Sequence, residues 1–462
     1  MKLPARPPEY RSLLREVAQD PDRLMHVMTS DIAPPTGYPH WDELRRKSTP
    51  EGLTPREWWL RIKSARLNGS RQLPLLLDVN GQPFWFTLTD DLLQLHERIV
   101  GGTSGHVLVS ELVTNADTKD RYIISSLMEE AITSSQLEGA VTTRVEAKDM
   151  LRSGREPRTK SEQMIVNNYR AMQFIREHIN EPLTPELVKR IHAIVTDATL
   201  DDPDAAGRLQ APDDKRVAVV DVRDGEVTHQ PPDAATLPER LERLCEFANG
   251  ADQGTYLPAT LRAIAIHFMV GYDHYFADGN GRTARALFYW SMLREGFWLA
   301  EFLTVSTILR QAPAQYSRSF LLTETDDGDL TYFFGYHVKV IVRAIEDLIA
   351  HLEHSMIEMR DLQHRLRAVP REFNHRQIAL LDHALRNPGF AYSATSHSTS
   401  HGVTEQTARN DLGDLQQRGY LVRGKQGRQH VWSPAPDLAN RIREGDSQNF
   451  KPNQRIERAC PL

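Results

Sequence analysis

Residues 274–285 read HYFADGNGRTAR and bring together an imidazole, a carboxylate, a Gly-Asn-Gly turn and two guanidinium groups. Gly279 and Gly281 allow the backbone to approach a ligand closely, and Asn280 between them tolerates unusual backbone angles. The following helix is predicted to begin near Gly281, so its free N–H groups would point back into the loop. Such a helix start is a ready site for an anion.

The charged side chains of this stretch extend the prediction from an anion to a phosphate. Arg282 and Arg285 are three residues apart, so both can reach one side of the helix. A guanidinium group can bind a phosphate through two parallel hydrogen bonds. Asp278 would repel a phosphate unless a cation bridged the two, and Mg²⁺ commonly binds through one or two carboxylates together with phosphates. His274 is a base whose ordinary pKa suits removal of a proton from a hydroxyl.

Two other interpretations of this stretch compete with a phosphate site. The spacing Gly279-x-Gly281-x-x-Ala284 matches the dinucleotide-binding fingerprint, but that fingerprint must follow a strand. Residues 258–274 show helical periodicity instead, which argues strongly against it. The second alternative is a polar turn between helices with incidental arginines. The spacing by itself favours a site over such a turn by about two to one.

The complete stretch resembles the signature of the Fic family, His-Pro-Phe-x-Asp/Glu-Gly-Asn-Gly-Arg-x-x-Arg. Eight of its nine specified positions match: His274, Phe276, Asp278, Gly279, Asn280, Gly281, Arg282 and Arg285. The departure is Tyr275, where the family usually has proline. The flanking helices and a hairpin also resemble the family over residues 120–350, half of the chain.

This resemblance implies a protein adenylyltransferase, which moves AMP from ATP to a Ser, Thr or Tyr hydroxyl of a protein. It implies that His274 takes the hydroxyl proton and that Asp278 holds Mg²⁺ against the α- and β-phosphates. The backbone of residues 279–281 would cradle the phosphates, with the side chain of the central asparagine near the α-phosphate. Arg282 would steady the loop, and Arg285 would meet the γ-phosphate.

A second motif precedes this core. Residues 134–139 read SSQLEG, and the glutamate sits at the end of a predicted helix, 121–139, where a carboxylate opposes the helix dipole. One interpretation of this residue is an ordinary surface glutamate at the end of a helix. However, Ser134-x-x-x-Glu138-Gly139 resembles the inhibitory motif of one class of Fic proteins. The resemblance implies that Glu138 pairs with Arg285 at the γ-phosphate position, or positions water for the removal of AMP.

Other expectations concern the target and the nucleotide. The hairpin predicted at 217–229 resembles the family's flap, which aligns a target segment by adding a strand, and an ordinary structural hairpin is nearly as good an interpretation. Tyr316 matches by position a tyrosine near the adenine pocket, with a core tyrosine as an equal alternative. His192 and His267 are interpreted as helix-core or surface residues, and no further ligands accompany them to make a zinc site.

The predicted fold class is mainly α: a Fic-type helical core with a β-hairpin flap, a small mixed N-terminal module and a C-terminal winged helix. The N-terminal module combines a helix around 55–67, a hairpin at 73–88 with an Asn-Gly turn, and a helix at 89–102. The expected domains are 1–110, the Fic domain 111–369, a winged-helix-like domain 370–436 and a tail 437–462.

The C-terminal module differs in composition from the core. Helices are predicted at 375–386 and 403–421, followed by short strands within 422–433, and the pattern resembles a winged helix with 404–418 as its recognition helix. Residues 371–433 contain eight Arg or Lys and five Asp or Glu, a local charge of +3. DNA contact through 404–428 is one hypothesis, and a protein-contact or homodimer wing is an equal alternative.

The totals describe an ordinary globular protein. The chain has 462 residues with a net charge of −6, so binding to nucleic acid along its whole length is not expected. Its two cysteines, Cys245 and Cys460, give no disulfide framework. No signal peptide and no apolar run long enough for a membrane span are evident, so a cytoplasmic location is expected.

These patterns support two classes of function. The first is a protein adenylyltransferase, modifying a target protein or itself, that Glu138 inhibits through Arg285. The alternative is a DNA-binding regulator whose Fic domain senses nucleotide or modifies itself. A Fic enzyme that removes AMP, or one that transfers another group, is a further variant of the first class.

Overall fold

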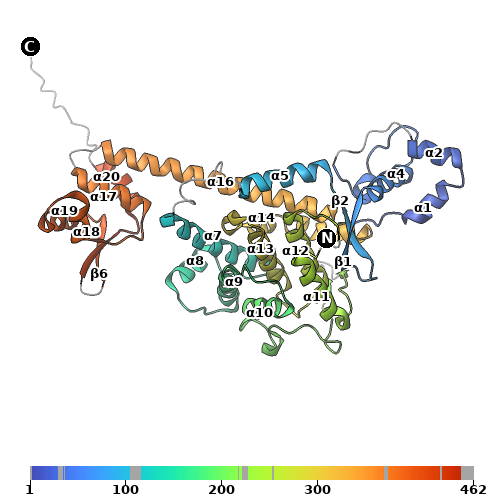
Figure 1. Cartoon of the computed structure of the whole chain (residues 1–462), viewed down its shortest axis with the longest axis horizontal. Helices are drawn as coiled ribbons and strands as arrows, with labels where there is room; N and C mark the ends of the chain where they lie inside the picture. The colour runs from blue at the N-terminus through green and yellow to red at the C-terminus, as the bar shows by residue number, and fades with distance from the viewer. Residues whose placement is uncertain are drawn as a thin grey trace, which may run out of the picture. The chain divides into compact units, whose positions relative to one another are not determined.

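The computed structural model describes residues 3–29, 35, 37–104, 116–216, 218–220, 227–251, 254–368, 373–426 and 429–448. The chain divides into two compact units, one of Met1–Leu108 with Ile123–Leu348 and the other of Val109–Tyr122 with Ile349–Leu462. Most described residues are helical and the three sheets are small, as the predicted mainly α class requires (Figure 1). No described helix is both long enough and apolar enough to span a membrane.

The N-terminal part of the first unit is a helical cluster followed by a hairpin. Its elements are α1 (Tyr10–Val17), α2 (Pro21–Thr29), α3 (Trp41–Leu44), α4 (Pro55–Asn68), β1 (Ser70–Leu77), β2 (Pro83–Thr87) and α5 (Asp90–Ser104). Thr54 and Glu57 form a capping box that starts α4, with Pro55 in its first turn. The two strands pair antiparallel around the predicted Asn80-Gly81 turn. The three predictions for this region are therefore confirmed.

Helices and one short hairpin make up the remainder of the first unit, and two of the helices, α7 and α16, continue into the residues of the second unit. The elements are α7 (Ala116–Leu137), α8 (Arg144–Ser153), α9 (Lys160–Glu177), α10 (Pro185–Thr196), β3 (Val219–Val220), β4 (Val227–His229), α11 (Leu237–Ala248), α12 (Ala259–Asp273), α13 (Asn280–Arg294), α14 (Val305–Gln311), α15 (Pro313–Thr325) and α16 (Thr331–Ala368). Short 3-10 turns lie at Pro203–Ala205, Ala234–Thr236 and Trp298–Phe302.

The pair α12 and α13 forms the centre of this unit. Nearly every residue of both helices is buried, and a helix that is buried all round belongs in the middle of a core. The two helices pack on each other, and α10 and α9 pack against α13 (Figure 1). The loop that joins α12 to α13 is the HYFADGNG stretch, so the core itself fixes both ends of that loop.

The second unit contains a compact arrangement of helices and strands after α16. Its elements are α17 (His375–Arg386), β5 (Tyr392–Ser393), α18 (Ala394–His401), α19 (Glu405–Gln417), β6 (Leu421–Gln426), β7 (Gln429–Pro434) and α20 (Leu438–Gln448). The strands pair in the order β5-β7-β6 around a buried cluster that includes Leu412 and Trp432. The predicted glycine and arginine of the wing tip, 427 and 428, lie outside the described residues.

Residues 393–402 are polar and nevertheless contain α18, which Ser393 and Ser396 start with a capping box, while only Ala394 and His397 of this helix are buried. Thr331–Ala368 is the single long helix α16. The strands of the 217–229 hairpin are present as β3 and β4, whereas its predicted turn lies outside the described residues.

Candidate active site

The end of α12 gives His274 an unusual backbone. His274 is the C-cap of this helix and has φ 46°, in the left-handed region that a non-glycine residue enters only when its surroundings hold it there. Its N–H donates to the carbonyl of Val270 at 3.2 Å, and its own carbonyl accepts from Arg216 Nη1 at 2.6 Å. The chain therefore turns sharply at the predicted base.

The imidazole of His274 is set up to accept a proton. Its Nδ1 lies 2.5 Å from the carbonyl oxygen of Gly271, which can only accept, so Nδ1 carries the hydrogen and Nε2 of the neutral ring is free. Burial lowers the pKa of His274 to about 4, and the charges of His229 and Arg216 act in the same direction. The ring is therefore neutral at physiological pH.

The loop after His274 is closed by its own side chains. Asn280 Oδ1 accepts from the N–H of Phe276 at 3.0 Å, and Asn280 Nδ2 donates to the Phe276 carbonyl at 2.7 Å. We expected this side chain near an α-phosphate, but both of its polar atoms bind the backbone of the loop. Gly279 has φ 79°, and a Cβ there would lie 2.6 Å from Thr196 of α10, so only glycine fits.

Arg282 and Asp278 are the charged side chains nearest each other in this loop and helix start. Arg282 is 1% exposed and donates from Nη1 to the Val195 carbonyl at 2.9 Å, which is a loop-holding contact. Its Nη2 is 4.0 Å from Asp278 Oδ1, and the Asp278 side chain is 60% exposed. Asp278 Oδ1 accepts from the N–H of Gly279 at 2.5 Å.

A metal ion fits here only if the protein and a bound phosphate share its coordination. No group of three or more His, Cys, Asp or Glu side chains gathers around a common point among the described residues. Asp278 is a single exposed carboxylate, and Mg²⁺ with one or two protein carboxylates takes its other ligands from water and substrate phosphates. The donor set therefore suits an ion that arrives with a polyphosphate.

Glu138 lies against the start of α13. Arg285 Nη2 donates to Glu138 Oε1 at 2.8 Å, and the guanidinium also donates to Ser134, from Nε to Oγ at 2.8 Å and from Nη2 to the carbonyl at 3.0 Å. The Glu138 carboxylate is so close to Gly281 that a Cβ there would overlap it. Gly139, with φ 92°, ends the turn after α7. The carboxylate thus lies at the helix start where the sequence predicts an anion site.

Arg285 has capacity for a further acceptor. Its residue is 2% exposed, and its Nη1 is buried without a hydrogen-bond partner in the described structure. Burial opposes the charged form, but Glu138, together with Tyr316 and Glu130, outweighs it and raises the pKa of Arg285, so the guanidinium stays protonated. A buried, charged donor that remains unsatisfied suits an incoming phosphate oxygen.

His274 and Glu138 share one cavity of about 290 Å³, which is also lined by Gly281, Tyr316, Phe320 and Glu324. Tyr316 is half-buried in this wall, and its hydroxyl lies 2.8 Å from Nε2 of the buried His267. Tyr316 therefore lines the cavity and is anchored to the buried helix α12 through His267. His274 and Gly281 at the start of α13 line the same space.

Comparison with known proteins agrees with this geometry. Residues 182–292 match the model of the Fic/DOC family. This part of the chain is a Fic domain. A crystal structure of a Fic family protein from Desulfovibrio desulfuricans G20 is similar in fold, with a TM-score of 0.50 and 17% identity over 76% of this chain and 98% of that chain.

Two further solved structures are more distant from this chain. Fic-1 from C. elegans gives a TM-score of 0.42 with 20% identity over 57% of this chain and 72% of that chain. A variant of IbpAFic2 in complex with adenylylated Cdc42 gives a TM-score of 0.31 with 12% identity over 72% of this chain and 94% of that chain.

Tyr275 takes the usual proline position of the Fic signature without leaving the turn loose. Its hydroxyl donates to Asp273 Oδ2 at 2.7 Å, and its carbonyl accepts from the N–H of Gln210 at 2.9 Å. Asp273 is fully buried and pairs through Oδ1 with Arg240 at 2.7 Å. A side-chain network therefore restrains the backbone where a proline ring would do so.

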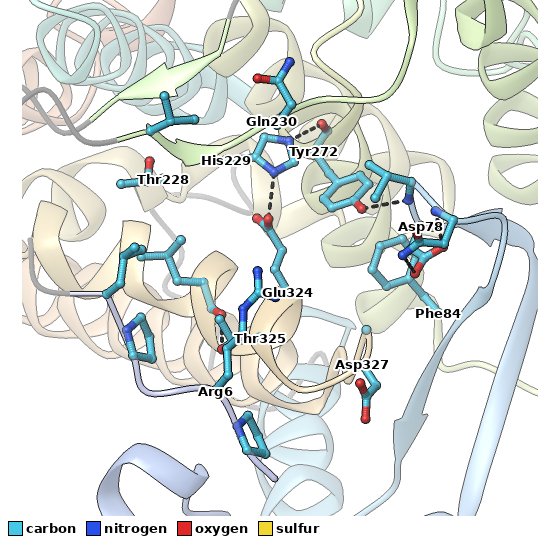
Figure 2. A pocket seen from close by; sticks show the side chains of 18 of the residues that line it. Arg6, Asp78, Phe84, Thr228, His229, Gln230, Tyr272, Glu324, Thr325 and Asp327 are labelled. Carbon is cyan, nitrogen blue, oxygen red and sulfur yellow. Dashed lines mark hydrogen bonds and ion pairs between the residues drawn. The ribbon is translucent and has the colours of Figure 1, made fainter. Parts of the chain in front are cut away.

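His229 was not singled out in the sequence, yet it lies beside the base. Its Nδ1 is 2.7 Å from Glu324 Oε2 and its Nε2 is 2.7 Å from the Tyr272 carbonyl, so both ring nitrogens carry hydrogen (Figure 2). Burial lowers the pKa of His229, but the Glu324 contact and the carbonyl outweigh burial and raise it. Its ring centroid is 6.4 Å from that of His274. A buried imidazolium thus fastens β4 to α15 and to the end of α12.

His192 also has a role that its sequence context did not indicate. It is a helix-core residue of the Fic domain, as one of the two interpretations held, and it stacks on Phe276 with a ring separation of 3.7 Å. Its Nδ1 accepts from the N–H of Gly207 at 2.9 Å, so Nε2 donates to the Asp278 carbonyl at 2.8 Å. Burial lowers its pKa to about 4, which preserves this neutral tautomer. His192 therefore holds the loop in place through its contacts with Phe276 and Asp278.

Proposed function

We propose that this chain is a protein adenylyltransferase that moves AMP from ATP to a Ser, Thr or Tyr hydroxyl of a protein, its own included. One observation carries the proposal: His274, whose Nδ1 is engaged by the Gly271 carbonyl, lines the same cavity as Gly281 at the start of α13. A hydroxyl and a polyphosphate in that cavity would lie side by side. The Fic/DOC match over residues 182–292 supports this chemistry.

The residues divide the reaction among themselves as follows. The target oxygen attacks the α-phosphorus as its proton passes to His274 Nε2, and the bond between that phosphorus and the bridging oxygen breaks, so pyrophosphate leaves. The backbone N–H groups at Gly281 and beyond, with Arg285, stabilise charge on the phosphate oxygens. Asp278 would hold Mg²⁺, which neutralises phosphate charge when bound. Arg282 and His192 keep the loop in shape.

We further propose that the chain rests in an inhibited state. The Glu138 carboxylate lies against Gly281 at the start of α13 and forms an ion pair with Arg285, so it stands where a phosphate would bind. A nucleotide must displace it to engage Arg285. The same carboxylate, next to His274 in the cavity, could instead orient a water for removal of AMP, and pre-labelled protein incubated without ATP tests that reverse reaction.

Incubation with labelled ATP and Mg²⁺ tests the forward reaction. We expect label in protein with the Glu138→Gly chain and none with Glu138→Gly/His274→Ala, because the second lacks the proton acceptor. A matched control is Glu138→Gly/His178→Ala, since His178 lies at the end of α9 and outside the cavity. Label that persists without His274 would contradict the assignment of the base.

DNA binding through the second unit is the second candidate function. The order of α17, β5, α18, α19, β6 and β7 supports a winged helix over residues 370–436. Gln406, Arg409 and Asn410 are exposed on α19, and these side chains suit base edges in a major groove. Arg423 and Lys425 are exposed on β6.

Salt-dependent binding of a DNA duplex by the full chain tests this candidate. Because each lost phosphate contact lowers the salt slope by about one, Arg423→Ala/Lys425→Ala should lower it by about two. His274→Ala should leave duplex binding unchanged while it abolishes AMP transfer. A duplex affinity that does not respond to salt would refute DNA contact and favour a protein-contact wing.

A further inference from the structure

A second cavity lies directly behind β4. It has a volume of about 660 Å³ and shares Thr228, His229, Leu321 and Glu324 with the cavity that holds His274. Side chains of β4 and α15 therefore line both cavities, and Figure 2 shows Thr228, His229 and Glu324 among them. An extended chain whose hydroxyl reaches His274 would place neighbouring side chains in this second cavity, here called the rear groove.

Carboxylates predominate around the rear groove. Glu9, Asp78, Glu324 and Asp327 line it, against the cations Arg6 and His229. The imidazolium of His229 is already matched by Glu324, at 2.7 Å. Asp327 is an open carboxylate, with 74% of its side chain exposed and its Oδ2 3.6 Å from Lys63 Nζ. Glu9 and Asp78 accept hydrogen bonds from neighbouring backbone N–H groups but keep their negative charge. Four carboxylates against two cations leave the groove with an excess of negative charge.

The one remaining cation of the groove comes from the N-terminal arm, residues 3–9. Pro4 is buried and the N–H of Ala5 donates to Asp42 Oδ1 at 3.2 Å, so the arm is fixed directly before Arg6. Arg6 itself is exposed, and Figure 2 shows its side chain extending into the groove toward Glu324. The chain therefore places its own guanidinium in the acidic space.

We propose that the rear groove binds an arginine or lysine of the target segment, and that Arg6 occupies that position in the resting chain. This inference rests on the proposed adenylyltransferase function and adds a substrate class to it: extended segments with a basic residue a few positions from the modified hydroxyl. The charge balance carries the choice. An acidic side chain would meet Asp78 and Asp327, whereas a basic one completes the pattern that Arg6 already begins.

A peptide library tests the proposal with the Glu138→Gly chain. Peptides with a fixed Ser, Thr or Tyr acceptor and Arg, Gln or Glu at each flanking position are labelled from ATP. We expect Arg to be favoured several-fold over Glu at one or two positions on one side of the acceptor. A preference for Glu, or none at any position, would overturn the inference.

Matched variants assign that preference to the groove. Asp327→Asn, which keeps a side chain that tolerates the φ of 56° at this position, should reduce the Arg preference by about two- to five-fold. Asp361→Asn removes an exposed carboxylate of α16 outside the groove and should change nothing. Arg6→Ala should increase labelling of the Arg peptides by a similar factor. A loss of labelling in Arg6→Ala would show that Arg6 recognises an acidic target instead.

Two readouts separate failure of this inference from failure of the proposed function. If the chain labels itself but shows no basic preference among peptides, the groove assignment is wrong and the enzymatic function stands. If no protein or peptide is labelled, the enzymatic function fails, and fluorescence anisotropy of the same Arg and Glu peptides still measures which of them binds. Equal binding of both would then reject the groove as well.

Discussion

Removal of the Glu138 carboxylate is the most direct perturbation of the proposed inhibited state. In Glu138→Gly the contact with Arg285 Nη2, 2.8 Å long, is lost, while Ser134 keeps its two hydrogen bonds to the same guanidinium. Arg285 therefore stays in position for a nucleotide. Gly139 already has a left-handed backbone, so a glycine before it should be accommodated at the end of α7.

The size of the effect follows from the contacts that hold the carboxylate. A hydrogen bond to a charged partner is worth about 1.5–3 kcal/mol, and a carboxylate at a helix start gains about 0.3–1 kcal/mol. The closed arrangement is then favoured by roughly 2–4 kcal/mol, which corresponds to a roughly 30- to 1,000-fold smaller open population. We expect Glu138→Gly to raise the initial rate of AMP transfer within that range.

The assay is the initial rate of label transfer from α-labelled ATP at a fixed Mg²⁺ concentration. Glu138→Gln is the matched control, because it keeps the side-chain length but loses the charge, and it should give a smaller increase. A single-turnover chase with unlabelled ATP distinguishes faster transfer from slower removal of AMP. An unchanged or lower rate in Glu138→Gly, with ATP bound as tightly as before, would refute the assignment of Glu138 as the inhibitor.

Three further predictions concern the base, its neighbours and the metal. Tyr275→Phe removes the bond to buried Asp273 and should lower the free energy of unfolding by about 1–3 kcal/mol in denaturant titration, and an unchanged midpoint would contradict the proline-replacing network. For pH dependence, the lowered pKa of His274, about 4, predicts that Glu138→Gly stays active well below pH 6. The raised pKa of His229 means that its ion pair with Glu324 is intact below the ordinary histidine pKa and is lost as pH rises through the raised value. Activity, and the protection of the flap in hydrogen exchange, should therefore fall at alkaline pH. Activity that stays constant at alkaline pH would count against this role of His229. Chelation of Mg²⁺ should abolish AMP transfer and leave Tm unchanged, because Asp278 is an exposed carboxylate that stabilises the fold little. Asp278→Asn should require more Mg²⁺ for the same rate.

The sequence predicted those features that depend on neighbouring residues. The Asn-Gly hairpin, the capped helices and the loop between α12 and α13 arise from local patterns, and the loop's donors come from one contiguous stretch. The contact between Glu138 and Arg285 joins residues 147 positions apart, and only the family resemblance indicated it. Nothing local to either residue encodes the distance between them.

The parts that sequence analysis missed depend on tertiary packing. His229 becomes an imidazolium because Glu324, 95 positions later, is brought to it, and His192 acts on the loop because α10 packs against α13. An isolated histidine on a helix or strand has no pattern that reveals such partners. The polar helix α18 was missed for a related reason, because a segment with two buried residues shows almost no apolar periodicity.

The placement of the Glu138 carboxylate against Gly281 and Arg285 constrains how this protein can evolve. The same donors would bind both the Glu138 carboxylate and the incoming nucleotide, so a substitution in α13 that weakens binding of one also weakens binding of the other. Activating substitutions should therefore accumulate along α7, which leads to Glu138, and be scarce in α13, which carries Arg285. A selection for hyperactive variants would show this difference between the two helices.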